Sequence, residues 1–190
     1  MYKFFLPLML GLAGCMSCNT GDAESDSSEV EEPQIVFDSC SQNIGDHPCN
    51  FALKNQHGEE IELYDSYGKI IIVDFSVMWC GPCQSMGMVA DTIVSDYGDD
   101  KVEWITLIIE DESGNPPDQE ALARWATSLG ITGDVLASSR EIIDPTATTG
   151  YPITAWPTYV VIDEKMVLQY GVKGWNEMTL RGILDSMIAE

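Results

Sequence analysis

Basic residues are scarce in this chain. Lysine and arginine number 9 against 31 aspartates and glutamates, which gives a formal net charge of −22 over 190 residues. A surface of that sign repels nucleic acid and anionic lipid headgroups, so neither is an expected partner. The only histidines, His47 and His57, lie in polar stretches typical of loops and are weak candidates for metal ligands. No apolar run reaches the roughly 20 residues that a membrane-spanning helix needs.

The first residues have the pattern of an export signal. Met1-Tyr2-Lys3 is weakly positive, the stretch 4–12 is apolar, and Leu12-Ala13-Gly14-Cys15 follows. These last four residues resemble the bacterial lipobox, in which the peptide is cleaved before a cysteine that receives lipid. The resemblance implies a lipoprotein signal peptide over 1–14 and a lipid membrane anchor on acylated Cys15, with the protein facing the periplasm or extracytoplasmic space. An ordinary cleaved signal with an incidental cysteine is the alternative.

A change of composition separates the N-terminal segment from the rest. Residues 15–36 are rich in serine, aspartate and glutamate and contain few large apolar side chains. Such a segment buries too little surface to offset the entropy of ordering it, so we expect an acidic disordered tether. The remaining residues, 37–190, are enough for one domain with a single core.

Strand and helix patterns alternate along this domain. The near-continuous apolar run over 70–77 is typical of a central strand covered on both faces. The other expected strands are 60–63, 102–109, 135–137, 158–162 and 167–170, and the expected helices are 82–97, 118–129, 140–144 and 176–188. The last two strands are close enough to form an antiparallel hairpin. The predicted fold class is therefore α/β, with a mixed central sheet flanked by helices.

Two cysteines lie where the central strand is expected to give way to a helix. The sequence there is Trp79-Cys80-Gly81-Pro82-Cys83. Two thiols at this spacing can close into a disulfide and open again. Cys80 lies near the free N–H groups and positive dipole end of the helix, which favour its thiolate. Because a thiolate is the species that attacks a disulfide, the motif predicts redox chemistry on protein thiols.

Together with the later Trp156-Pro157-Thr158, this motif closely resembles the thioredoxin superfamily over about residues 50–190. The similarity is to the membrane-tethered TlpA/ResA-like group, of the redoxin or AhpC-TSA type, because residues 50–63 resemble that group's N-terminal extension. It implies a thioredoxin-like fold with an N-terminal extension and a thiol–disulfide oxidoreductase without a cofactor. The implied partners are protein clients with thiols or disulfides, and a membrane electron donor.

The resemblance also implies a role for each matching residue. Cys80 is expected to be the exposed nucleophile and Cys83 the more buried resolving cysteine. Pro157 matches the family's cis-proline, which lies against the dithiol. The residues expected to contact substrate are Trp79, Trp156 and Thr158. Trp156 departs from the family pattern, since a small or aliphatic residue is usual there, and we expect it to reshape the substrate groove.

Two carboxylates complete the candidate catalytic set. Asp74 lies six residues before Cys80, where thioredoxins keep a buried carboxylate. Burial should raise its pKa and let it accept a proton from Cys83, although a plain salt-bridged aspartate is the alternative. Glu110 matches an active-site glutamate of the TlpA/ResA-like group. Two acidic residues follow it, so a solvated acidic loop is the competing interpretation.

The remaining cysteines allow several assignments. Cys40 and Cys49 flank a short polar loop and are candidates for a structural disulfide, worth roughly 2–3 kcal/mol in the chain-entropy model. Alternatively, this pair passes electrons to the Cys80–Cys83 pair. Cys18 is either a second membrane-proximal thiol or an intermolecular partner.

The residues around the dithiol also bear on the direction of electron flow and on alternative functions. Gly81-Pro82 is the dipeptide of thioredoxin, whose potential of about −270 mV favours reduction of clients. A zinc site built from the four cysteines at 40, 49, 80 and 83 lacks the usual close paired spacings, so no metal site is expected. Met78, Met86 and Met88 allow the alternative of a copper or thiol-binding chaperone without turnover. A peroxidase is not favoured, because Val77 occupies the position of the threonine or serine of peroxiredoxins.

Overall fold

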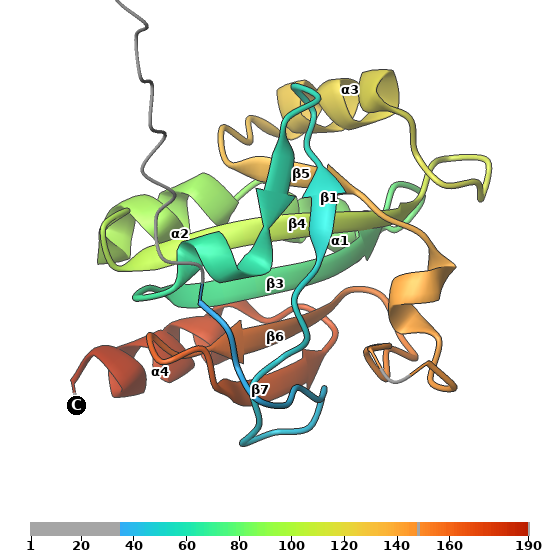
Figure 1. Ribbon diagram of the computed structural model, residues 1–190. Helices are drawn as coiled ribbons and strands as arrows, with labels where there is room; N and C mark the ends of the chain where they lie inside the picture. The colour runs from blue at the N-terminus through green and yellow to red at the C-terminus, as the bar shows by residue number, and fades with distance from the viewer. Residues whose placement is uncertain (1–34, 148, 190) are drawn as a thin grey trace, which may run out of the picture. The chain divides into compact units, whose positions relative to one another are not determined.

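Five strands form the central sheet in the order β5-β4-β3-β6-β7 (Figure 1). The computed structural model describes residues 35–147 and 149–189. The parallel strands are β3 (Ile70–Val77), β4 (Val102–Glu110) and β5 (Asp134–Ala137), and the antiparallel strands are β6 (Thr158–Ile162) and β7 (Leu168–Lys173). The α/β class, the mixed sheet and the C-terminal hairpin are therefore confirmed. The expected signal peptide, Cys15 and Cys18 lie outside the described residues.

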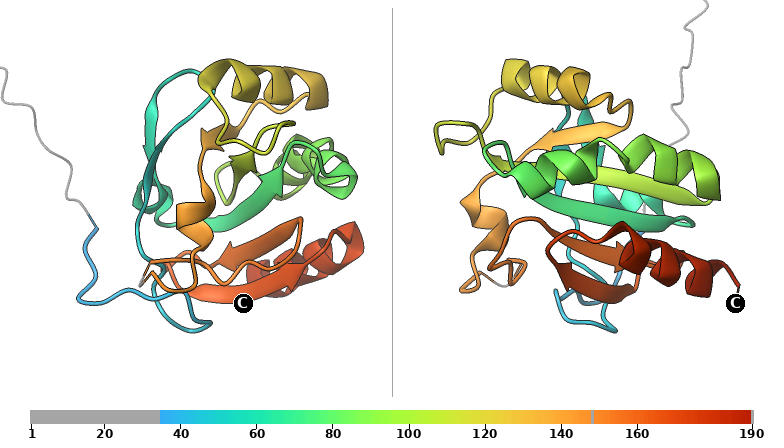
Figure 2. Two further views of the ribbon diagram at one scale, coloured as in Figure 1. Left: turned by 90° about the vertical axis from the view of Figure 1, so that its right-hand side faces the viewer. Right: turned by 180° about the vertical axis from the view of Figure 1, so that it is seen from behind.

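The central strand β3 is buried along its whole length because helices and loops cover both faces of the sheet. Successive side chains of a strand point to opposite faces. Ile70 and Ile72 accordingly join the core formed with helices α1 (Gly81–Gly87), α2 (Ala90–Tyr97) and α4 (Glu177–Ile188). Val73 and Phe75 join the core beneath α3 (Gln119–Leu129). The left view of Figure 2 shows α1, α2 and α4 together on one side of the sheet.

The N-terminal extension forms a separate two-stranded sheet on the other side. β1 (Ala52–Lys54) pairs with β2 (Glu60–Glu62), and the 3₁₀ helix η1 (Leu63–Ser66) follows directly. The turn residue Asn55 fixes the hairpin to the main sheet, since its Nδ2 donates to Asp134 Oδ1 at 2.8 Å. Only the second of these strands was predicted. β1 has only three residues and is followed by a polar turn, so it is too short to show the alternation of apolar and polar residues that predicts a strand.

The predicted single helix over 82–97 is wrong in one respect. The chain forms two helices there, and Met88 and Val89 separate α1 from α2. At the end of α1, a Cβ added to Gly87 would lie 2.8 Å from Leu129 Cδ1, so the glycine permits close packing against the end of α3. Gly98 ends α2 with a φ of 98°, a conformation that favours glycine. The break is therefore set by packing between distant helices and leaves α1 as a short platform for the dithiol.

The remaining helices begin as predicted. Asn176 caps α4 by accepting the Thr179 N–H at 3.0 Å, and Asp118 caps α3 by accepting the Ala121 N–H at 2.8 Å. The short helix expected at 140–144 is the 3₁₀ helix η2 (Arg140–Ile143). Across residues 35–147 and 149–189, none of the helices combines the length and apolar character needed to cross a membrane.

Candidate active site

The dithiol is built by the end of β3 and the start of α1. Cys80 is the N-cap of α1, and its Sγ accepts the backbone N–H of Cys83 at 3.2 Å. Pro82 occupies the first turn, where its missing N–H costs no helical hydrogen bond. A disulfide joins Cys80 and Cys83, whose Cα atoms are 5.2 Å apart. Cys80 keeps 7% of its surface exposed whereas Cys83 has none, so Cys80 is the accessible member of the pair.

The start of β6 lies at the same edge of the sheet. Thr158 pairs with Phe75, which places the residues before β6 beside the end of β3. The Trp156–Pro157 peptide bond is cis, and Pro157 is buried. The Pro157 carbonyl accepts the Gly174 N–H at 2.7 Å. The structure thus brings Pro157 to the sheet edge that carries the dithiol.

Asp74 lies inside the domain, on the face of β3 that is covered by α1. The side chain is 1% exposed, and Ser76 Oγ donates to its Oδ1 at 2.6 Å. Burial raises the pKa of Asp74 to about 7, and the hydroxyls of Ser76 and Thr106 oppose this rise with smaller effects. Thr106 is the register partner of Asp74 on β4. A carboxyl group with a pKa near 7 can both take up and release a proton at neutral pH.

Glu110 ends β4 and lies behind the dithiol turn. Its side chain is 7% exposed, and its carboxylate contacts residues from two other segments. Trp79 Nε1 donates to Oε2 at 3.0 Å, and the Arg140 guanidinium forms an ion pair with Oε1. The Glu110 carbonyl also accepts the N–H of Met78 at 2.9 Å. Glu110 is therefore not part of a solvated acidic loop, and that interpretation is wrong.

The three expected substrate contacts differ in their exposure. Trp79 is 51% exposed beside Cys80, and Trp156 is partly buried next to Pro157. Thr158 is buried, and its hydroxyl donates to the Ala155 carbonyl at 2.8 Å. The two tryptophans can therefore contact a client, whereas the Thr158 hydroxyl is used to close the turn before β6.

A second disulfide joins Cys40 and Cys49, whose Cα atoms are 4.8 Å apart. The loop between them is held on β7, since the Gly45 N–H donates to the Leu168 carbonyl at 2.8 Å and Leu168 donates to Asp46 at 2.9 Å. Leu168 pairs with Ile162 at the end of β6, whereas Pro157 precedes the start of that strand. This loop is thus attached to the opposite end of the β6–β7 ladder from the cis-proline. The arrangement favours a structural disulfide.

The zinc and copper alternatives are not supported by a cluster of metal ligands in the described residues. The four thiols proposed for zinc form two separate disulfides. Met78 and Met86 are buried in different cores, and Met88 is 57% exposed. The His47 ring stacks on Phe37 with 3.7 Å between centroids. Over the described part of the chain, no three histidine, cysteine or acidic residues lie close enough together to hold a metal ion.

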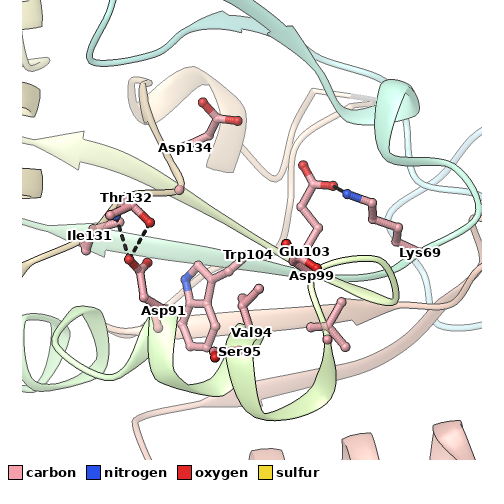
Figure 3. Close-up of a pocket in the computed structure, with 14 residues that line it drawn as sticks. Lys69, Asp91, Val94, Ser95, Asp99, Glu103, Trp104, Ile131, Thr132 and Asp134 are labelled. Atoms are coloured by element: carbon pink, nitrogen blue, oxygen red, sulfur yellow. Dashed lines mark hydrogen bonds and ion pairs between the residues drawn. The ribbon is translucent and has the colours of Figure 1, made fainter.

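One cavity lies away from the dithiol (Figure 3). It has a volume of about 470 Å³ and opens between α2 and the first residues of β4 and β5. Its polar lining is largely paired internally. Asp91 accepts the Thr132 N–H at 2.8 Å and its hydroxyl at 2.6 Å, and Lys69 pairs with Glu103 at 2.8 Å. None of the candidate site residues lines this cavity, so it is separate from the dithiol site.

Three residues of the site were missed from the sequence. Ser76 had a usable signal, because residues two apart on a strand share a face and Ser76 follows Asp74 at that spacing. Thr106 and Arg140 had none, since each meets its partner only through the pairing of distant segments. Arg140 comes 30 residues after Glu110 in the sequence, and α3 and β5 lie between the two residues along the chain.

The fold and the Cys80–Cys83 pair define a thiol–disulfide oxidoreductase of the thioredoxin-like class. The chain belongs to the AhpC/TSA family, whose model matches residues 44–171. It is similar to the thioredoxin-like protein YneN of Bacillus subtilis, with 23% identity over 125 residues that make up 66% of this chain and 68% of YneN. It is also similar to the thiol-disulfide oxidoreductase ResA of Halalkalibacterium halodurans, with 28% identity over 63% of this chain and 62% of ResA.

A solved structure supports the same fold. The thiol:disulfide interchange protein of the thioredoxin family from Chlorobium tepidum superposes with a TM-score of 0.61 at 18% identity. The superposition covers 77% of this chain and 99% of the Chlorobium tepidum chain. At that identity the likeness establishes the fold.

Proposed function

We propose that this protein reduces disulfides in extracytoplasmic protein clients through the Cys80–Cys83 dithiol. The observation that carries the proposal is the hydrogen bond from the Cys83 N–H to Cys80 Sγ at the start of α1. A donor aimed at this sulfur stabilises a thiolate there once the disulfide is reduced. The direction is supported by Gly81-Pro82, the dipeptide of thioredoxin, whose low potential favours the reduction of clients.

The proposed reaction has two displacement steps. The Cys80 thiolate attacks one sulfur of the client disulfide, and the other client sulfur leaves as a thiolate. Cys83 then attacks Cys80 Sγ, so the mixed disulfide breaks and the second client sulfur leaves. The client gains two electrons, and the Cys80–Cys83 disulfide forms. A dithiol reductant, supplied by a membrane electron donor, returns two electrons and two protons to the pair.

Asp74 is proposed to manage the proton of the second step. Cys83 must lose its proton to attack, and it has no exposed surface from which water could take that proton directly. Burial keeps the pKa of Asp74 near 7, so at neutral pH a substantial fraction of this carboxyl group is free to accept a proton. Pro157 and the two tryptophans are proposed to form the surface on which the client rests.

The location outside the cytoplasm rests on the N-terminal sequence. Leu12-Ala13-Gly14-Cys15 is similar to a lipobox, and residues 15–36 have the composition of a tether. We propose that lipid on Cys15 holds the domain at a membrane, within reach of the electron donor. Mass spectrometry of the native N-terminus tests this anchor, since an unmodified Cys15 would refute it.

Insulin reduction tests the activity. With dithiothreitol as the electron source, we expect the purified protein to reduce insulin disulfides and Cys80→Ser to be inactive. Thr132→Val, a substitution in the separate cavity of Figure 3, is the matched control and should keep full activity. Undiminished insulin reduction by Cys80→Ser would refute the mechanism.

A further inference from the structure

The carboxylate of Glu110 ties the dithiol turn to a distant loop. The Glu110 side chain accepts the Trp79 indole N–H at 3.0 Å, and the backbone carbonyl of Glu110 accepts the N–H of Met78 at 2.9 Å. Met78 and Trp79 are the two residues before Cys80. The same carboxylate is paired with Arg140 from η2. Glu110 is thus the middle member of a chain of contacts that runs from Arg140 to the residue beside the nucleophile.

The Arg140–Glu110 pair differs from the other ion pairs in burial. Among the ion pairs of the described residues, Glu110 is 7% exposed, whereas every other carboxylate is between 24% and 84% exposed. A buried carboxylate that loses its counter-charge is strongly disfavoured, whereas an exposed one is solvated by water. Arg140 is therefore the partner that holds the Glu110 side chain in its contact with Trp79.

Arg140 is anchored by its loop and not by packing. Its side chain is 67% exposed. Ser139 caps η2 by accepting the Glu141 N–H at 3.3 Å, and the Ile142 carbonyl accepts the Tyr151 N–H at 2.8 Å. These contacts hold the short helix at a fixed place beside the loop that leads to Pro157. The guanidinium is thus presented to Glu110 from a defined position.

We propose that Arg140 is a positioning residue of the thiol–disulfide reaction: through Glu110 it fixes the Trp79 ring beside Cys80 as a preformed contact for the client. Trp79 is half exposed, so the ring has a free face for a client and a polar edge held by Glu110. A side chain that is already immobile loses little entropy when a client binds, which lowers KM without altering the chemical step. The client contact rests on the proposed function, whereas the fixing of Trp79 does not.

Two kinds of measurement test this assignment on the full chain. Arg140→Met keeps the length of the side chain and removes its charge, and Arg140→Lys restores the charge. Arg124→Met is the matched control, because Arg124 forms an exposed i,i+4 pair with Glu120 on α3. For insulin reduction we expect Arg140→Met to raise KM roughly threefold to tenfold with kcat unchanged. Arg140→Lys should recover part of the loss, and Arg124→Met should match the parent.

A double-mutant cycle with Trp79→Phe shows whether Arg140 acts through the ring. We expect Arg140→Met to have no further effect on KM once Trp79 is replaced. An undiminished effect of Arg140→Met in the Trp79→Phe background would overturn the proposal. Identical KM values for Arg140→Met and Arg124→Met in the parent background would overturn it equally.

Fluorescence separates this inference from the proposed function. The chain has five tryptophans, so the fluorescence of Trp79 is obtained by subtracting the fluorescence of the matching Trp79→Phe variant. Acrylamide should quench this contribution more strongly in Arg140→Met than in the parent, even if neither protein reduces insulin. If Arg140→Met does not fold, the double variant with Glu110→Gln and Arg140→Met removes both charges together. This variant is expected to show the same increase in acrylamide quenching of Trp79. Equal quenching in parent and folded variant would refute the role of Arg140.

Discussion

Ser76 donates its hydroxyl to Asp74 at 2.6 Å, and this is the one hydrogen bond that the buried carboxyl group makes to a side chain of the described residues. The other carboxyl oxygen, Oδ2, has no partner within that part of the chain. An ionised carboxylate is poorly accommodated by such surroundings, because burial removes water and the hydroxyls of Ser76 and Thr106 compensate for only part of that loss. The high proton affinity of Asp74 follows from this shortage of donors.

Asp74 should make the oxidised protein less stable as the pH rises. Its folded-state pKa of about 7 lies above the ordinary value of 3.8. Between these values the folded protein holds a proton that the unfolded chain has released, so the free energy of unfolding falls from about pH 4 to about pH 7. Asp74→Asn should remove this dependence and stabilise the protein at pH 8 by up to roughly 4 kcal/mol.

Denaturant unfolding across this pH range measures the effect. Glu120→Gln, which alters an exposed carboxylate on α3, is the control and should follow the parent. Parallel pH profiles for Asp74→Asn and the parent would show that Asp74 keeps an ordinary pKa in the folded state.

Thr106→Val should shift the pH dependence of the resolving step. The Thr106 hydroxyl lowers the pKa of Asp74, so its removal raises that pKa further. The ionised form of Asp74 accepts the proton of Cys83, and its population then rises at a higher pH. Stopped-flow measurement of mixed-disulfide resolution should show the acidic limb, where the rate rises with pH, displaced to higher pH. Thr132→Val is the control, and an unchanged midpoint in Thr106→Val would argue against Asp74 as the proton acceptor.

The Cys40–Cys49 disulfide should support stability and not turnover. Replacing both cysteines by serine releases a short loop on β7, and we expect a loss of roughly 2–3 kcal/mol in the free energy of unfolding. Insulin reduction should be unchanged below the unfolding transition, since this loop is held at the far end of the β6–β7 ladder. A folded double variant without activity would instead indicate electron transfer through this pair.

The Cys80–Cys83 pair should have a reducing potential. Gly81-Pro82 is the dipeptide of thioredoxin, so equilibration with dithiothreitol should give a value near the thioredoxin potential of about −270 mV. A value near that of DsbA, about −120 mV, would reverse the proposed direction and indicate an oxidase or isomerase. Arg124→Met should leave the potential unchanged.

Local sequence signals predicted the part of the site that lies on one segment. The apolar run of β3 and the dithiol turn at Cys80 act over a few residues, and both are visible in the sequence. The burial of Asp74 followed from its place on a strand covered on both faces. These features depend on periodicity and helix-end chemistry, which short windows contain.

The features that were missed depend on contacts between distant segments. The break between α1 and α2 reflects the packing of Gly87 against Leu129, and no proline marks it. The pairing of Glu110 with Arg140 requires the chain to pass through α3 and β5 before it returns to the site. Such contacts are fixed by the topology of the sheet, which a single sequence specifies only through the completed fold.

Client trapping tests the central claim most directly. In the full chain, Cys83→Ser removes the resolving thiol, so a client that has reacted with Cys80 should remain attached as a mixed disulfide. Mass spectrometry of non-reduced complexes should locate every such bond at Cys80, and Cys80→Ser should trap no client. Absence of mixed disulfides in the folded Cys83→Ser protein, or equal trapping by Cys80→Ser, would contradict the assignment of Cys80 as the nucleophile.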